Sequence, residues 1–267
     1  MNRIAQVFRR LKARGEKALI PFITAGDPDL ETSRRLALTL ARSGADILEL
    51  GIPFSDPLAD GPTIQAASQR ALKAGATFPA VLELAGRLRQ DLDLPLVLMG
   101  YYNPILQHGL EKTAREAAEC GVDGFIIPDL PLEEAEPWRR AAVAHGVAPI
   151  FLAAPTSGPE RLRRLGRLTR GFLYYVSITG ITGARRELPP ELAEALREVR
   201  RLVSCPVAVG FGISTPEQVA GLAPYVDGVV VGSAIVERVA RLQGEALLQE
   251  IGDFVAALKA PLRPSGA

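Results

Sequence analysis

Short apolar runs alternate with amphipathic stretches along most of the chain. The apolar runs predict eight strands: Ala18–Thr24, Asp46–Gly51, Leu94–Gly100, Gly124–Leu130, Ala148–Ala154, Phe172–Ser177, Pro206–Gly212 and Gly228–Ser233. Apolar residues at three- and four-residue spacing predict helices between the runs, for example over Glu31–Arg42, Ala80–Gln90, Glu133–Ala144 and Glu191–Val203. Continuously apolar strands indicate burial on both faces, and strands that alternate with helices pair in parallel.

Eight such units predict a closed (β/α)₈ TIM barrel. An open, doubly wound sheet is the alternative, but no GxGxxG fingerprint follows the first strand. The length of 267 residues fits one barrel and no linker divides the chain, so we expect a single domain over residues 1–267. Ile4–Arg14 predicts an extra N-terminal helix, within residues 1–15, that can plug the barrel, and residues 260–267 predict a frayed tail.

Composition and charge narrow the classes of function. With a formal net charge of +1, the chain gives no reason to expect nucleic acid or an anionic membrane as a partner. It has neither a run of roughly 18 apolar residues nor the apolar core of a signal peptide near its start, so we expect a cytoplasmic protein. The two cysteines (Cys120, Cys205) and two histidines (His108, His145) lack metal-binding spacing, and we expect no metal.

Two acids stand out in residues 46–65, which read DILELGIPFSDPLADGPTIQ. Glu49 interrupts an apolar strand, where a buried carboxylate is unfavourable unless its charge is compensated or its pKa is shifted. Asp60 follows a turn rich in Pro and Gly that can fold back over the strand end. Because barrel enzymes carry their chemistry at the carboxyl ends of the strands, we predict that the two acids act together.

The ends of the last three strands predict a phosphate site. Ser177 begins a loop rich in Gly and Thr, which is typical of a lid or a phosphate loop. Gly212 and Gly232 allow backbone amides to approach an anion, and Ser233 begins a predicted helix whose first amides favour phosphate. Each feature alone is compatible with a tight turn, but together they favour phosphate.

Aromatic residues near strand ends predict a place for a flat apolar ligand. Phe22, Tyr174 and Phe211 can sandwich such a ligand, although ordinary core packing is the alternative for each. Four polar residues lie at other strand ends, where turn or lid contacts are as compatible as substrate contact: Asp27, Tyr101, Asn103 and Asp129.

Several motifs in order along nearly the whole chain resemble the tryptophan synthase α subunit family. They are PFITAGDP, ELGIPFSDPLADGPTIQ, LMGYYNPI, FIIPDLP, ITGITG, GFGIS and VVVGSAIV. The resemblance implies a (β/α)₈ barrel and a lyase of tryptophan biosynthesis (EC 4.2.1.20), which cleaves indole-3-glycerol phosphate to indole and glyceraldehyde 3-phosphate without a cofactor.

The resemblance also implies roles for individual residues. Glu49 matches the general acid/base that protonates indole C3, and Asp60 matches the residue that binds the indole N–H. We expect an apolar strand end to raise the pKa of Glu49 and a polar loop to keep Asp60 ionised. The implied phosphate ligands are Gly183, Gly212, Gly232 and Ser233, and the implied indole pocket comprises Phe22, Met99, Ile126, Tyr174 and Phe211. Thr182 is expected to close over the site and touch Asp60, and Gly100 departs from the bulkier residue expected of the family.

The family further implies a β subunit that uses pyridoxal phosphate to join indole to serine, in an α₂β₂ assembly. The expected docking residues are Pro53, Asp56, Pro57, Asn103 and Pro104. Two other functions stay open at this point: another phosphate-sugar barrel enzyme, such as an isomerase or epimerase, and a non-catalytic barrel that activates a partner. The lack of a His-rich site disfavours the first, and the presence of both acids disfavours the second.

Overall fold

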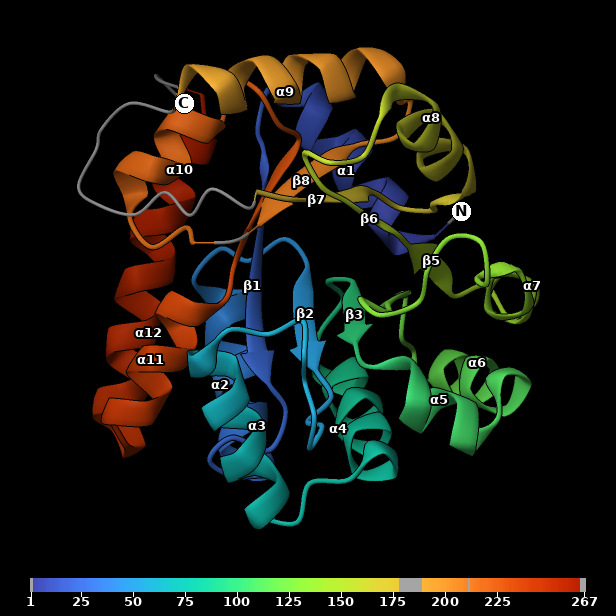
Figure 1. Cartoon of the computed structure of the whole chain (residues 1–267). Coiled ribbons are helices and arrows are strands. Elements are labelled where there is room, and N and C mark those ends of the chain that lie inside the picture. The colour runs from blue at the N-terminus through green and yellow to red at the C-terminus, as the bar shows by residue number, and fades with distance from the viewer. Residues whose placement is uncertain (1, 178–188, 211, 265–267) are drawn as a thin grey trace.

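The computed structural model describes residues 2–177, 189–210 and 212–264, and its strands form a nearly closed parallel barrel surrounded by helices (Figure 1). The strands are β1 (Ala18–Thr24), β2 (Leu48–Gly51), β3 (Leu96–Met99), β4 (Gly124–Ile126), β5 (Ala148–Ile150), β6 (Leu152–Ala153), β7 (Leu173–Val176), β8 (Val207–Gly210) and β9 (Gly228–Val231). They are ordered β5-β4-β3-β2-β1-β9-β8-β7-β6. The predicted (β/α)₈ fold is confirmed.

The fifth predicted strand is interrupted, so nine strands are formed in the described chain where eight were predicted. β5 pairs with β4, and β6 pairs with β7, so the barrel closes through this one stretch of chain. Phe151 lies at the break, and its amide donates to the Thr169 hydroxyl at 3.1 Å. At this position the backbone amide bonds to a side chain instead of to a neighbouring strand. The apolar pattern of the sequence does not indicate such a break.

All the described helices except α1 cover the outside of the barrel, and the barrel interior has an apolar core of its own. They are α1 (Arg3–Ala13), α2 (Leu30–Arg42), α3 (Pro62–Lys73), α4 (Phe78–Asp91), α5 (Tyr102–His108), α6 (Leu110–Glu119), α7 (Glu136–Ala144), α8 (Pro159–Leu168), α9 (Pro190–Leu202), α10 (Pro216–Leu222), α11 (Ser233–Arg241) and α12 (Gly244–Lys259). A short 3₁₀ helix, η1 (Ala260–Leu262), follows, and its Leu262 is buried. This part of the tail is therefore packed rather than frayed.

Helix α1 plugs the amino-terminal end of the barrel, as its amphipathic pattern predicts. Ile4 and Phe8 are buried in one apolar cluster with inward-facing strand residues such as Ile20 and Val97. Gly124 and Gly171 make room for this helix, because a Cβ at either position would lie within about 3 Å of Ile4.

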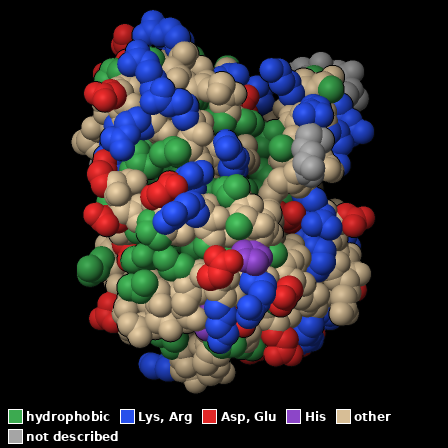
Figure 2. All heavy atoms as spheres, turned by 90° about the vertical axis from the view of Figure 1, so that its right-hand side faces the viewer, with side chains coloured by type: hydrophobic (Ala, Val, Ile, Leu, Met, Phe, Trp, Pro, Cys, Tyr) green, Lys and Arg blue, Asp and Glu red, His purple; other side chains and the backbone are tan. Residues whose placement is uncertain are grey.

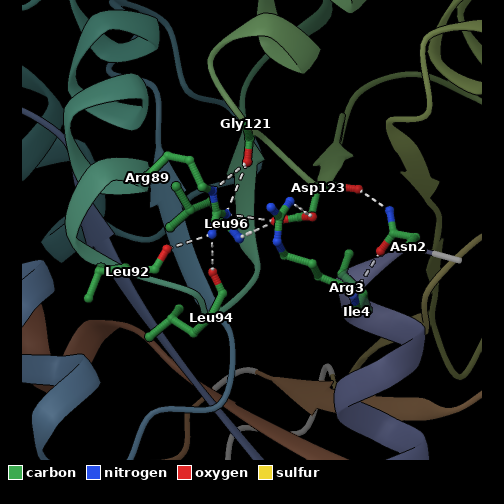
Figure 3. Close-up of polar contacts among 9 residues, drawn as sticks. All are labelled: Asn2, Arg3, Ile4, Arg89, Leu92, Leu94, Leu96, Gly121 and Asp123. Carbon is green, nitrogen blue, oxygen red and sulfur yellow. Dashed lines mark hydrogen bonds and ion pairs between the residues drawn. The ribbon is translucent and has the colours of Figure 1, made fainter.

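A polar cluster centred on Asp123 fastens α1 and α4 to the barrel (Figure 3). The Asp123 carboxylate accepts from Arg89 at 2.8 Å, from Arg3 at 3.2 Å and from the Leu96 amide at 3.0 Å. Asn2 donates to the Asp123 carbonyl at 2.6 Å. The Asp123 side chain is only 5% exposed, so these partners take the place of water around the carboxylate.

We expect Arg89→Met to lower the free energy of unfolding by about 3 kcal/mol, because it leaves a buried carboxylate without its closest cation. Arg87→Met, on the same helix, removes an exposed ion pair with Glu31 and should change stability by less than about 1 kcal/mol. Urea unfolding of both variants measures the difference. Equal losses for the two variants would contradict the assigned role of Arg89.

Candidate active site

Glu49 lies near the carboxyl end of β2, paired with Phe22 of β1 on one side and Val97 of β3 on the other. Its side chain is almost fully buried, and its Oε2 has no hydrogen-bond partner within the described chain. Burial, and secondarily the charge of Asp60, raises the pKa of Glu49 to about 8. The carboxyl group is therefore protonated near neutral pH and can act as an acid.

Asp60 lies at the end of the loop between β2 and α3. Its Oδ2 accepts a hydrogen bond from the Tyr101 hydroxyl at 3.0 Å. Burial raises the pKa of Asp60, and the Tyr101 hydroxyl opposes this effect. The expectation of a fully polar environment for Asp60 is therefore wrong in part, because the carboxylate is partly buried. The charge of Asp60 in turn helps to raise the pKa of Glu49.

Both acids line a cavity of about 270 Å³ at the carboxyl end of the barrel. The predicted residues on its wall, besides the acids, are Phe22, Met99, Tyr174, Gly212, Gly232 and Ser233. Sequence reasoning missed four further lining residues: Gly61, Ile64, Ile213 and Val230. Ile64, Ile213 and Val230 are aliphatic, so their residue type does not indicate a role in a site. Their position near a strand end or near Asp60 is the one feature of the sequence that could have indicated it.

Other predicted site residues lie elsewhere. Ile126 is fully buried in the barrel core and does not line the cavity. Thr182, Gly183 and Phe211 lie outside the described residues.

One end of the cavity has the features of an anion site. Ser233 is the first residue of α11, so the amino-terminal end of this helix meets the cavity wall. Gly212 has a φ of +72°, a conformation that glycine adopts readily. Unpaired amides and the helix dipole at such an end favour a phosphate group. The acids and this end share the same cavity, which suits a ligand that is phosphorylated at one end.

Two glycines make room for the aromatic walls of the cavity. A Cβ at Gly51 would lie 2.4 Å from the Phe22 ring, and one at Gly210 would lie 2.3 Å from the Tyr174 hydroxyl. Sequence reasoning assigned neither glycine this role. At Gly100 a Cβ would lie 2.8 Å from Ile52, so Ile52 fills the space that the bulkier family residue would need.

The remaining polar candidates have structural partners. Asp27 forms a two-point ion pair with Arg70 of α3, at 2.7 and 2.8 Å. Asp129 accepts from the Tyr102 amide at 2.9 Å. Of the expected docking residues, Asp56 and Asn103 are exposed, Pro104 is half-buried, and Pro53 and Pro57 are buried.

Each histidine contacts a glutamate side chain. His108 lies 2.6 Å from Glu116, and His145 lies 2.6 Å from Glu111.

On the face shown in Figure 2, acidic and basic side chains are interspersed. In the part of the chain that the structure describes, no three His, Cys, Asp or Glu residues gather as metal ligands. No helix among the described residues has the length and apolarity needed to cross a membrane.

A parallel (β/α)₈ barrel whose cavity holds a buried glutamate, a partly buried aspartate and a helix amino terminus defines a barrel enzyme of acid–base chemistry. The chain belongs to the family described as tryptophan synthase alpha chain, whose model matches residues 8–260. It is 53% identical over 259 residues to the tryptophan synthase alpha chain of Citrifermentans bemidjiense, covering 97% of each chain. It is 50% identical to that of Geotalea uraniireducens, covering 100% of each.

The structural comparison agrees with the sequence comparison. The crystal structure of tryptophan synthase subunit alpha from Legionella pneumophila superposes with a TM-score of 0.90 at 40% identity, covering 98% of each chain. The chain is thus a lyase of the EC 4.2.1.20 type that carries out the α reaction of tryptophan biosynthesis. The family match favours this function over the isomerase, epimerase and non-catalytic alternatives.

We expect Gly210→Ala to lower kcat/KM for indole-3-glycerol phosphate by about 10²-fold, because the new methyl group displaces the Tyr174 ring from the cavity wall. Gly158→Ala is the matched control, since no atom lies within 4 Å of its Cβ position. Steady-state kinetics and thermal unfolding separate loss of function from loss of structure. Wild-type kinetics in Gly210→Ala would show that Tyr174 does not shape the site.

Proposed function

We propose that Glu49 and Asp60 perform the retro-aldol cleavage of indole-3-glycerol phosphate to indole and glyceraldehyde 3-phosphate. The observation that carries this proposal is the buried Glu49 carboxyl, which has an unpartnered oxygen and a pKa raised to about 8, in the same cavity as Asp60. Such a group holds a proton at neutral pH and can transfer it to carbon.

The reaction needs one proton delivered and one removed. Glu49 gives its proton to indole C3, which leaves a positive charge on the ring nitrogen. The Asp60 carboxylate accepts a hydrogen bond from that N–H and stabilises the charge. Removal of the proton from the adjacent hydroxyl forms the aldehyde, and the electrons of the broken carbon–carbon bond restore the indole ring. If Glu49 accepts this second proton, it returns to its starting state.

The rest of the cavity binds the two ends of the substrate. Gly212, Gly232 and Ser233 hold the phosphate at the start of α11, and we assign Gly183 to the same group. Phe22, Met99 and Tyr174 contact the indole ring. Phe211 and the closing residue Thr182 keep the roles that the family resemblance implies, whereas the buried Ile126 supports the cavity from the barrel core. The indole ring protonated at C3 is itself the electron sink for the broken carbon–carbon bond, so we assign no cofactor to this chain.

The released indole passes to a β subunit that carries pyridoxal phosphate, in a cytoplasmic α₂β₂ assembly. We place the docking surface at Pro53, Asp56 and Pro57 together with Asn103 and Pro104. Exposed leucines in the same two segments support this placement: Leu58 is 93% exposed and Leu106 is 48% exposed. An exposed large apolar side chain in each segment suits a surface that a partner covers.

We expect the purified chain to release indole from indole-3-glycerol phosphate without added metal or cofactor, and to do so faster with the β subunit. Glu49→Gln should lower kcat by about 10²-fold or more, because glutamine cannot donate the proton. Glu111→Gln, at an exposed position, is the matched control. Full activity in Glu49→Gln would disprove the assigned acid, and absence of indole in every wild-type reaction would disprove the cleavage itself.

The pH dependence provides a separate prediction. A general acid works only when protonated, so kcat/KM should fall as the pH rises through about 8, the value to which burial raises the pKa of Glu49. Asp60 and Tyr174 are the ionisable groups coupled to Glu49 in this cavity. Indole release measured across this range checks the expectation. A rate that rises through pH 8 would mean that Glu49 acts first as a base.

A further inference from the structure

We infer that a small cavity behind Asp60 holds one ordered water molecule, which links the Thr24 hydroxyl to the Asp60 carboxylate. Thr24 and Ser68 are then positioning residues, because they act on the substrate through Asp60. The inference deepens the proposed function and rests on it, since Asp60 is the group assigned to the indole N–H.

The cavity adjoins the larger one that both acids line, because the two share Asp60 and three apolar wall residues: Phe22, Ile64 and Met99. Its volume of about 10 Å³ is close to the space that one water molecule requires, and a larger ligand does not fit. A buried water needs roughly two to four polar partners. The polar side chains on the wall of this cavity belong to Thr24, Asp60, Ser68 and Tyr101.

Thr24 brings to this cavity a hydroxyl group that still needs a partner. It is the last residue of β1 and only 2% exposed, and its Oγ1 has no hydrogen-bond partner among the described residues. A buried hydroxyl without a partner is unfavourable. Thr24 follows Phe22 by two residues on one strand, so both side chains point to the same face, where the cavity lies. A water in this cavity satisfies the hydroxyl.

Ser68 approaches the cavity from α3. It is buried and lies one helical turn after Ile64, so both side chains share the face of the helix that lines the cavity. The Tyr101 hydroxyl already donates its proton to Asp60 Oδ2 at 3.0 Å. The hydroxyls of Thr24 and Ser68 are therefore the groups that donate to the water, which in turn donates to Asp60.

A hydrogen bond from this water favours the ionised form of Asp60. Burial raises the pKa of Asp60 and the Tyr101 hydroxyl opposes this effect, and a second donor acts in the same direction as Tyr101. In the described part of the chain, the titratable groups that face Asp60 are Tyr101, Glu49 of β2 and Tyr174 of β7. None of these is a cation, so the charge on Asp60 depends on neutral donors.

High-resolution crystal structures of the wild-type chain and of Thr24→Val test the site directly. In the wild-type chain we expect a water within hydrogen-bond distance of Thr24 Oγ1 and of an Asp60 carboxylate oxygen. The water should be lost in Thr24→Val, which keeps the shape of the side chain and lacks the donor. A wild-type cavity without this water would overturn the inference.

Kinetics test the effect on Asp60. Thr24→Val should lower kcat/KM for indole-3-glycerol phosphate about tenfold and move the acidic limb of its pH profile to higher pH by about 0.5 to 1, because losing a donor raises the pKa of Asp60. Ser68→Ala should move the limb in the same direction, and Thr24→Ser, which keeps the hydroxyl, should behave as wild type. Thr113→Val is the matched control, because Thr113 Oγ1 on α6 is also buried and unpartnered in the described chain but lines neither cavity.

The outcomes separate this inference from the proposed function. If Asp60→Asn abolishes cleavage while Thr24→Val keeps wild-type kinetics and pH profile, the water link is disproved and the lyase assignment stands. Equal changes in Thr24→Val and Thr113→Val would also disprove the link, since they would reflect packing alone. If Asp60→Asn retains full activity, the proposed role of Asp60 fails, and the inference fails with it.

Discussion

The burial of Glu49 without a compensating charge is the constraint on which the rest of the site depends. Taking a carboxyl group out of water raises its pKa, and here no described side chain offsets that effect. The surrounding structure therefore keeps this carboxyl group away from bulk water. Strand neighbours flank the group, α1 fills the far end of the barrel, and the Phe22 and Tyr174 rings wall the cavity. Exclusion of water makes the ionised carboxylate unfavourable. For the same reason the carboxyl group keeps its proton near neutral pH and can donate it.

The two ends of the barrel treat buried acids in opposite ways. At the amino-terminal end, Asp46 pairs with the buried Lys259 at 2.8 Å and Asp123 pairs with Arg89. At the carboxyl end, Glu49 follows Asp46 by three residues and forms no ion pair with any described residue. These ion pairs fasten α12 and α4 to the barrel, whereas Glu49 is free to take part in proton transfer. Charges that stabilise the fold and the acid that reacts thus lie toward opposite ends of the barrel.

The sequence pattern located every strand, because burial on both faces leaves an uninterrupted apolar run. It also singled out Glu49, since one acid in such a run is conspicuous. It did not reveal features that arise from contacts between distant segments. The break at Phe151 depends on Thr169, the room for Tyr174 depends on Gly210, and the packing of Leu262 depends on an amide of Lys17. The shielding of Asp60 was missed for the same reason, because a loop rich in polar and small residues gives no sign that Tyr101 lies against it.

The placement of Asp60 on a loop rather than a strand has an electrostatic consequence. Its charge helps to raise the pKa of Glu49, and that effect decreases with the distance between the two carboxyl groups. If Asp60 were part of a strand, the strand pairing would determine the distance between the two carboxyl groups. Because Asp60 belongs to a loop, its position depends on Tyr101 and on whatever holds the loop. Glu49 is therefore positioned by its strand, whereas the position of Asp60 is set by the hydrogen bonds that hold the loop.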